Sequence, residues 1–142
     1  MYFQDNASSL RLDVVNYELA EDSDAEERNW LVLRCTWVDE EGTIRKDSNS
    51  CLTTWELREL SAGLKVLRAG LKESYHSDFT ESFFQVDAWP EGEAFRLDVS
   101  FVLPNTMDGD DTAELSCAMT AAELQALTDE LDALGVKFPD RT

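Results

Sequence analysis

Two segments of this sequence share one pattern, a threonine-led helix start followed by regularly spaced leucines. The segments 53–56 and 120–123 both run from threonine to glutamate, the capping-box arrangement at the start of many helices. Leucines then recur every three or four residues, as on the buried face of an amphipathic helix: Leu57, Leu60, Leu64, Leu67 and Leu71, then Leu124, Leu127, Leu131 and Leu134. The sequence therefore predicts two amphipathic helices, the first stopping near Gly70 and the second ended by Gly135 and Pro139.

The remaining sequence contains short runs in which apolar and polar residues alternate. This period of two is typical of half-buried strands, and short turns between sequential strands favour antiparallel pairing. Three such runs precede each predicted helix: 10–19, 29–38 and 43–47, then 79–89, 94–103 and 114–119. We therefore predict an α+β fold in the order β-β-β-α-β-β-β-α. We expect a single antiparallel sheet of about six strands, with two amphipathic helices covering one face and the other face left available.

The chain has 142 residues and no linker-like stretch, so we expect one domain, 1–142. Its apolar runs are far shorter than the roughly 20 residues of a membrane-spanning helix, and its first residues do not resemble a signal peptide. Cys35, Cys51 and Cys117 lack metal-ligand spacing, and Cys35 and Cys117 lie in alternating runs where thiols are usually buried. We expect a cytoplasmic protein without membrane span, metal or cofactor.

The sequence is strongly acidic. It contains 30 Asp and Glu against 12 Lys and Arg, a formal net charge of -18. The excess is uneven, because Arg96 is the only lysine or arginine between residues 73 and 136. A negative surface repels nucleic acid and anionic membranes and attracts cationic proteins. We therefore expect a basic protein partner, no nucleic acid and no membrane. The alternative is that the charge serves solubility alone.

No residue pattern is typical of a catalytic site. His76 is the only histidine and lies in a polar segment, 73–78, that predicts an exposed loop. The segment 108–111 clusters carboxylates but lacks the residue order of a calcium loop. Carboxylates are so numerous that no pair of them identifies a glycosidase site. We predict that the protein is not an enzyme and has no catalytic residues; a small hydrolase using carboxylates is the alternative.

Several motifs, taken in order along the whole chain, resemble those of the WapI-type bacterial immunity proteins. They are Tyr17-Glu18, Asn29-Trp30-Leu31, Leu52-Thr53-Thr54-Trp55-Glu56-Leu57, Leu124 and the terminal Phe138-Pro139-Asp140-Arg141. The resemblance implies a cytoplasmic antitoxin that blocks the C-terminal toxin domain, often a nuclease, of a contact-delivered or secreted protein. The chain has Ser82 where the family pattern has proline, and its segment 21–27 is unusually acidic, which suggests a different partner. We expect Trp30, Trp55 and Leu57 in the core.

The active-site surface of a nuclease is basic because it binds phosphates, so an acidic protein surface can bind there in place of the nucleic acid. We predict that the acidic later half of the chain forms the docking surface, with Trp89 as an aromatic anchor. The predicted partner-binding residues are Asp87, Trp89, Glu91, Glu93, Asp108, Asp110, Asp111 and Glu114. We expect a monomer, or a weak homodimer formed through an exposed edge strand. The alternative function is a non-catalytic interaction module or adaptor.

Overall fold

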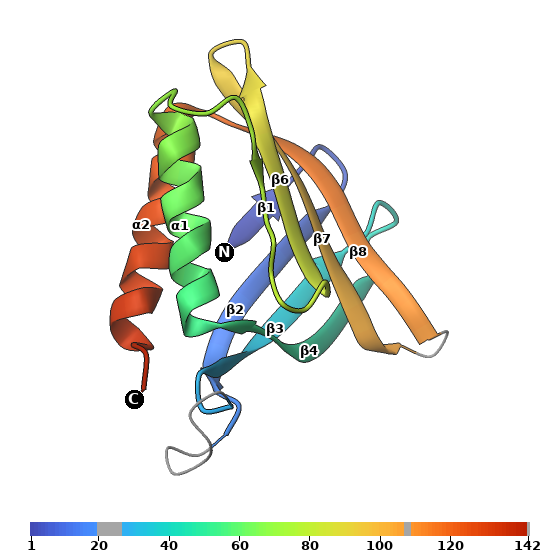
Figure 1. The fold of residues 1–142 in the computed structure, drawn as a ribbon. Helices are drawn as coiled ribbons and strands as arrows, with labels where there is room; N and C mark the ends of the chain where they lie inside the picture. The colour runs from blue at the N-terminus through green and yellow to red at the C-terminus, as the bar shows by residue number, and fades with distance from the viewer. Residues whose placement is uncertain (20–26, 107–108, 142) are drawn as a thin grey trace.

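The computed structural model describes residues 1–19, 27–106 and 109–141. Within these residues the chain twice forms four strands followed by a helix (Figure 1). The elements are β1 (Tyr2–Gln4), β2 (Ser9–Tyr17), β3 (Trp30–Val38), β4 (Ile44–Thr53), α1 (Thr54–Arg68), β5 (Tyr75–His76), β6 (Phe84–Glu91), β7 (Ala94–Thr106), β8 (Gly109–Met119) and α2 (Ala121–Lys137). The acidic segment 21–27, expected to be a solvated loop, lies almost entirely outside the described residues.

The strands form two separate antiparallel sheets. Sheet A contains β1 to β4 and sheet B contains β5 to β8, each in sequence order. The predicted α+β class is confirmed, but the single sheet of about six strands is wrong. β1 and β5 have only three and two residues, so alternation cannot reveal them in the sequence. Alternation also does not show whether strands before α1 pair with strands after it. In the structure the strands before α1 form sheet A and those after it form sheet B.

Both sheets and both helices share one hydrophobic core. In Figure 1 the helices lie side by side on the left, sheet B lies across from them, and the strands of sheet A cross those of sheet B. β4 packs against β7, and β1 and β2 pack near β8. Each sheet therefore covers part of the other. The sequence alone predicts that only the two helices cover a sheet face. Leu57 is buried as expected, whereas Trp30 is half-buried and Trp55 is exposed.

Both predicted capping boxes are present, and the first does more than begin a helix. Thr53 accepts a hydrogen bond from the Glu56 backbone N–H, and the Glu56 carboxylate accepts from the backbone N–H of Thr53 at 3.0 Å. The second Glu56 oxygen accepts from the backbone N–H of Thr80 at 2.6 Å. Glu56 is only 2% exposed, and its carboxylate satisfies the buried N–H of Thr53 and the partly buried N–H of Thr80. It joins the start of α1 to the chain leading into β6.

The predicted helix ends are partly right. Gly70, with φ of 76°, follows the end of α1, where only glycine takes this backbone conformation without strain. Gly135, in contrast, lies inside α2, which continues to Lys137. Phe138, with φ of -122° and ψ of 71°, is the first residue beyond the helix.

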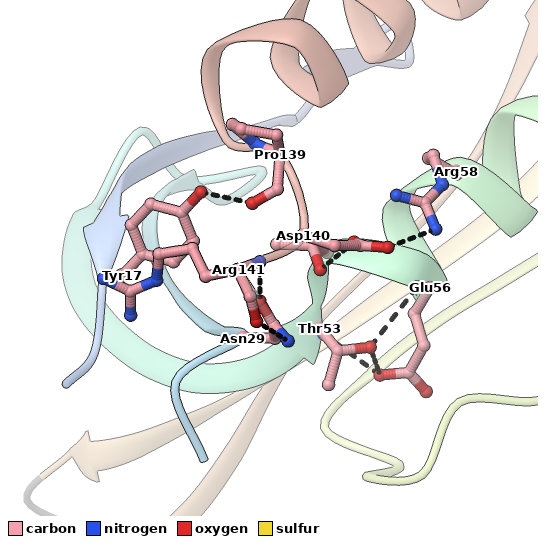
Figure 2. Close-up of polar contacts among 9 residues, drawn as sticks. Tyr17, Asn29, Thr53, Glu56, Arg58, Pro139, Asp140 and Arg141 are labelled. Atoms are coloured by element: carbon pink, nitrogen blue, oxygen red, sulfur yellow. Dashed lines mark hydrogen bonds and ion pairs between the residues drawn. The ribbon is translucent and has the colours of Figure 1, made fainter. Parts of the chain in front are cut away.

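Pro139, Asp140 and Arg141 at the C-terminal end bind to β2, to the residue before β3 and to α1 (Figure 2). The Asn29 side chain donates to the Arg141 carbonyl at 3.2 Å and accepts from the Arg141 N–H at 2.7 Å. The Tyr17 hydroxyl donates to the Pro139 carbonyl, and the Arg141 guanidinium lies 3.7 Å from the centre of the Tyr17 ring. Several motifs that carry the family resemblance therefore bind one another, and these contacts join the two ends of the sequence.

Two aspartates strengthen the helix layer. Asp132 of α2 accepts hydrogen bonds from Lys65 and Ser61 of α1 at 2.6 and 2.7 Å. Asp140 accepts from Arg58 and Thr54 at 2.7 and 2.5 Å. The bond from Lys65 lowers the pKa of Asp132 and the bond from Arg58 lowers the pKa of Asp140, in both cases below the ordinary value of 3.8.

The two capping boxes offer a matched test of the buried carboxylate. We expect Glu56→Ala to lower the free energy of unfolding by about 3 kcal/mol, since buried donors lose a charged acceptor. Glu123→Ala removes the equivalent but exposed box of α2 and should cost about 1 kcal/mol. Urea denaturation measures both. Equal losses would show that the burial of Glu56 and its bond to Thr80 contribute nothing.

The lowered pKa values of Asp132 and Asp140 predict how stability responds to acid. A carboxylate whose pKa is lower in the folded state stabilises the fold above its unfolded pKa, and this contribution is lost as the pH falls through the folded pKa. We expect the variant D132N/D140N to be less stable than the parent near pH ~7 and equally stable at pH ~2. Urea denaturation across this range measures the difference. A difference that stays constant below the ordinary value of 3.8 would contradict it.

Candidate functional site

Sheet B buries one face and leaves the other open to solvent. Along β6, Phe84, Val86 and Ala88 are buried, whereas the residues between them are exposed or half-buried. β7 and β8 alternate in the same way, because successive side chains of a strand point to opposite faces. We call the solvent side the outer face of sheet B. Three rows of residues cross it: Gln85, Ser100 and Glu114; Asp87, Asp98 and Ser116; Trp89, Arg96 and Ala118.

The charges on this face are arranged unfavourably for folding. Asp87 of β6 lies directly opposite Asp98 of β7, and like charges in such a pair destabilise a sheet. The Nδ1 atom of His76 lies 2.7 Å from Asp87 and relieves part of this repulsion when the imidazole is protonated. Within the described residues neither Asp98 nor Glu114 has an ion pair. These two carboxylates therefore contribute no ion pair to the described fold.

An open depression of about 450 Å³ lies on the outer face. Short serine side chains, Ser100 and Ser116, lie between larger neighbours on β7 and β8, which leaves the surface hollow. The carboxylates of Asp87, Asp98 and Glu114 line it. Its polar side-chain groups are hydroxyls and carboxylates, with one amide from Gln85, and Val99 and Leu115 complete the lining.

A second depression, of about 380 Å³, lies between β8 and the turns of sheet A. Glu114 lines both depressions. The carboxylates that join it there come from the first part of the chain: Asp5, Asp39, Glu40 and Glu41, with Arg45 beside them. The acidic surface is therefore not confined to the later half of the sequence.

Two of these carboxylates are fixed by the turns that carry them. Asp5 accepts hydrogen bonds from the backbone N–H groups of Ala7 and Ser8, which lower the pKa of its carboxyl group and keep it ionised. Asp39 accepts from the backbone N–H groups of Glu41 and Thr43, both at 3.0 Å, in the turn between β3 and β4. Turn formation therefore places negative charge at the edge of β8.

The predicted partner-binding residues divide into groups. Asp87, Trp89, Glu91 and Glu114 share the outer face of sheet B. Glu91 accepts from Arg96 at 2.7 Å, and this bond lowers the pKa of its carboxyl group. Glu93 is exposed in the turn after β6.

The other predicted residues do not join this group. Asp111 is paired in register with the buried Leu103, so it points away from the outer face, and it forms an ion pair with Arg45 of β4. Asp108 and the side chain of Asp110 lie outside the described residues. Sequence reasoning missed Asp98, although its outward position in the alternating run 94–103 could have revealed it.

The three cysteine thiols are buried. Burial raises the pKa of Cys35 and of Cys51 to about 12 and that of Cys117 to about 11, so these thiols stay protonated at neutral pH. His76 is exposed as expected, but it lies in the short strand β5 and not in a loop. Across the described residues, no group of three or more His, Cys, Asp or Glu is arranged to hold a metal ion. No helix in that part of the chain is long and apolar enough to span a bilayer.

Comparison with known proteins gives a family match by sequence and weak similarity to solved structures. Residues 1–139 match the family described as immunity protein WapI-like. No curated protein matches the sequence. The crystal structure of WHY1 from Arabidopsis thaliana is similar over 99% of this chain and 88% of that chain, with 13% identity and a TM-score of 0.46, too low to support an argument. Because the family match covers all but the last three residues, this protein belongs to the immunity protein WapI-like family.

Proposed function

We propose that this protein is an immunity protein that neutralises the toxin domain of a bacterial polymorphic toxin by binding it. Family membership supports the immunity role. The single observation that carries the proposed mode of action is the outer face of sheet B, where Asp87 faces Asp98 at a cost to folding. A residue pair that opposes folding is expected at functional sites.

The proposed target is a basic domain, such as a nuclease. A nuclease holds phosphates with lysine and arginine, so an acidic protein surface can cover those groups and exclude the substrate. The formal net charge of -18 also speeds the encounter of the two proteins. Inhibition then requires no chemical step by this chain, and it takes place in the cytoplasm of the cell that must be protected.

The shape of the surface favours binding over catalysis. The depression on the outer face of sheet B is open, with Asp87 and Asp98 on adjacent strands of an exposed sheet. A hydrolase that uses two carboxylates must hold the scissile bond between them and control the water that attacks it. An open acidic sheet instead fits a broad, cationic protein surface.

The test uses the C-terminal domain of a large secreted protein encoded beside the gene for this chain, which is where the proposed immunity role places the toxin. We expect co-expression of the two to restore the growth of bacteria that the domain alone inhibits. We also expect one-to-one binding that weakens at least about tenfold when NaCl rises from about 0.05 to about 0.5 M, since salt screens charges. Isothermal titration calorimetry measures the affinity. A toxin domain of similar charge from an unrelated locus is the control, and equal protection against both would contradict specific immunity.

A further inference from the structure

We propose that the toxin docks on a surface centred on Glu114 of β8, and that it inserts a loop bearing arginine or lysine into the depression beside Asp98. This inference rests on the proposed function and names the docking site within it. The surface comprises the outer face of sheet B, the edge of β8 and the adjacent turns of sheet A. It differs from the site predicted from the sequence, because Asp111 is excluded and Asp98 is included.

The first argument is continuity. Three depressions of about 450, 380 and 400 Å³ adjoin around β8. Glu114 lines the first and second, Ser116 the first and third, and Asp5 the second and third. Because neighbouring depressions share lining residues, they form one hollowed surface that runs from β6 across β7 and β8 to the β1–β2 and β3–β4 turns. A protein loop needs an extended surface of this kind.

The second argument is the chemistry of the central depression. Asp87 and Asp98 are opposite each other, and Glu114 is diagonal to Asp98, because Glu114 pairs with Ser100 and Asp98 with Ser116. Opposite Cβ atoms lie about 5 Å apart and diagonal ones about 7 Å, so one guanidinium with its five N–H donors can reach two of these carboxylates. The hydroxyls of Ser100 and Ser116 supply further acceptors at the floor. The site therefore fits a cation that donates several hydrogen bonds.

The third argument is that the nearby arginines are already paired with other carboxylates. Of the nearby arginines, Arg96 is held by Glu91 and Arg45 by Asp111 and Asp39. Within the described residues Asp98 and Glu114 form no ion pair of their own. A cation from a partner would therefore relieve the repulsion between Asp87 and Asp98 without breaking an existing ion pair of Asp98 or Glu114.

The fourth argument is the opposite charge of the other sheet. The solvent side of sheet A carries exposed Arg11, Arg34 and Lys46, and its Asp13 is already paired with Arg11. A basic partner is repelled from sheet A and attracted to sheet B. This polarity orients the chain during the encounter and selects one of its two sheet faces.

The experiment compares three double variants in calorimetric binding to the toxin domain encoded beside the gene. D98K/E114K reverses the centre of the proposed site and should weaken binding at least ~100-fold. D98N/E114Q removes the charges while keeping size, and should weaken binding ~10-fold. E59K/D129K makes the same change in net charge on the exposed sides of α1 and α2, and should weaken binding less than ~3-fold. Because all four substituted positions, Asp98, Glu114, Glu59 and Asp129, are exposed, thermal unfolding should show folded variants.

The possible outcomes distinguish failure of the docking site from failure of the proposed function. If the unaltered chain does not bind the toxin domain, the proposed function fails and the docking site fails with it. If the unaltered chain binds and D98K/E114K binds equally well, the function stands and the docking site is wrong. Equal weakening by E59K/D129K would show that only net charge matters, which also overturns the site. Sedimentation of the chain alone is the last check, because a dimer abolished by D98K/E114K would assign this face to a second copy.

Discussion

Burial of one face of sheet B in the shared core constrains the rest of this molecule. Phe84, Val86 and Ala88 on β6, and their counterparts on β7 and β8, pack against sheet A and the helices. Because a strand alternates its side chains, every residue between them must face solvent. Asp87, Asp98 and Glu114 are held together on that side although they repel one another. The apolar core therefore provides the free energy that keeps an unfavourable charge arrangement in place.

The parts of the chain that stabilise the fold are separate from the parts proposed to bind. Asn29, Tyr17 and Arg141 fasten the C-terminal residues, and Glu56 satisfies buried backbone donors at the start of α1. These residues carry the family resemblance, and none of them lies on the outer face of sheet B. Substitutions on the outer face of sheet B can therefore change the charge there without removing the contacts that stabilise the fold.

The overall charge of -18 conceals a polarity between the two sheets. Positive side chains gather on the solvent side of sheet A, while carboxylates gather on sheet B and at the turns beside β8. Net charge sets how strongly a basic partner is attracted from a distance, and this polarity sets which face it meets. The two effects differ in their dependence on position, which is why matched charge reversals at different sites can separate them.

The sequence by itself determined the local elements. Capping boxes and leucine spacing located both helices, because helix starts depend on hydrogen bonds between residues three apart. Alternation located β2, β3, β6 and β7, but only about half of β4 and of β8. The polar residues at the start of β8 look like a loop, and pairing with β7 makes them a strand, which turns Asp111 away from Glu114. Only the tertiary structure decided the division into two sheets and brought Asp5 and Asp39 beside Glu114, because such contacts join residues far apart in the chain and leave no periodic trace in its sequence.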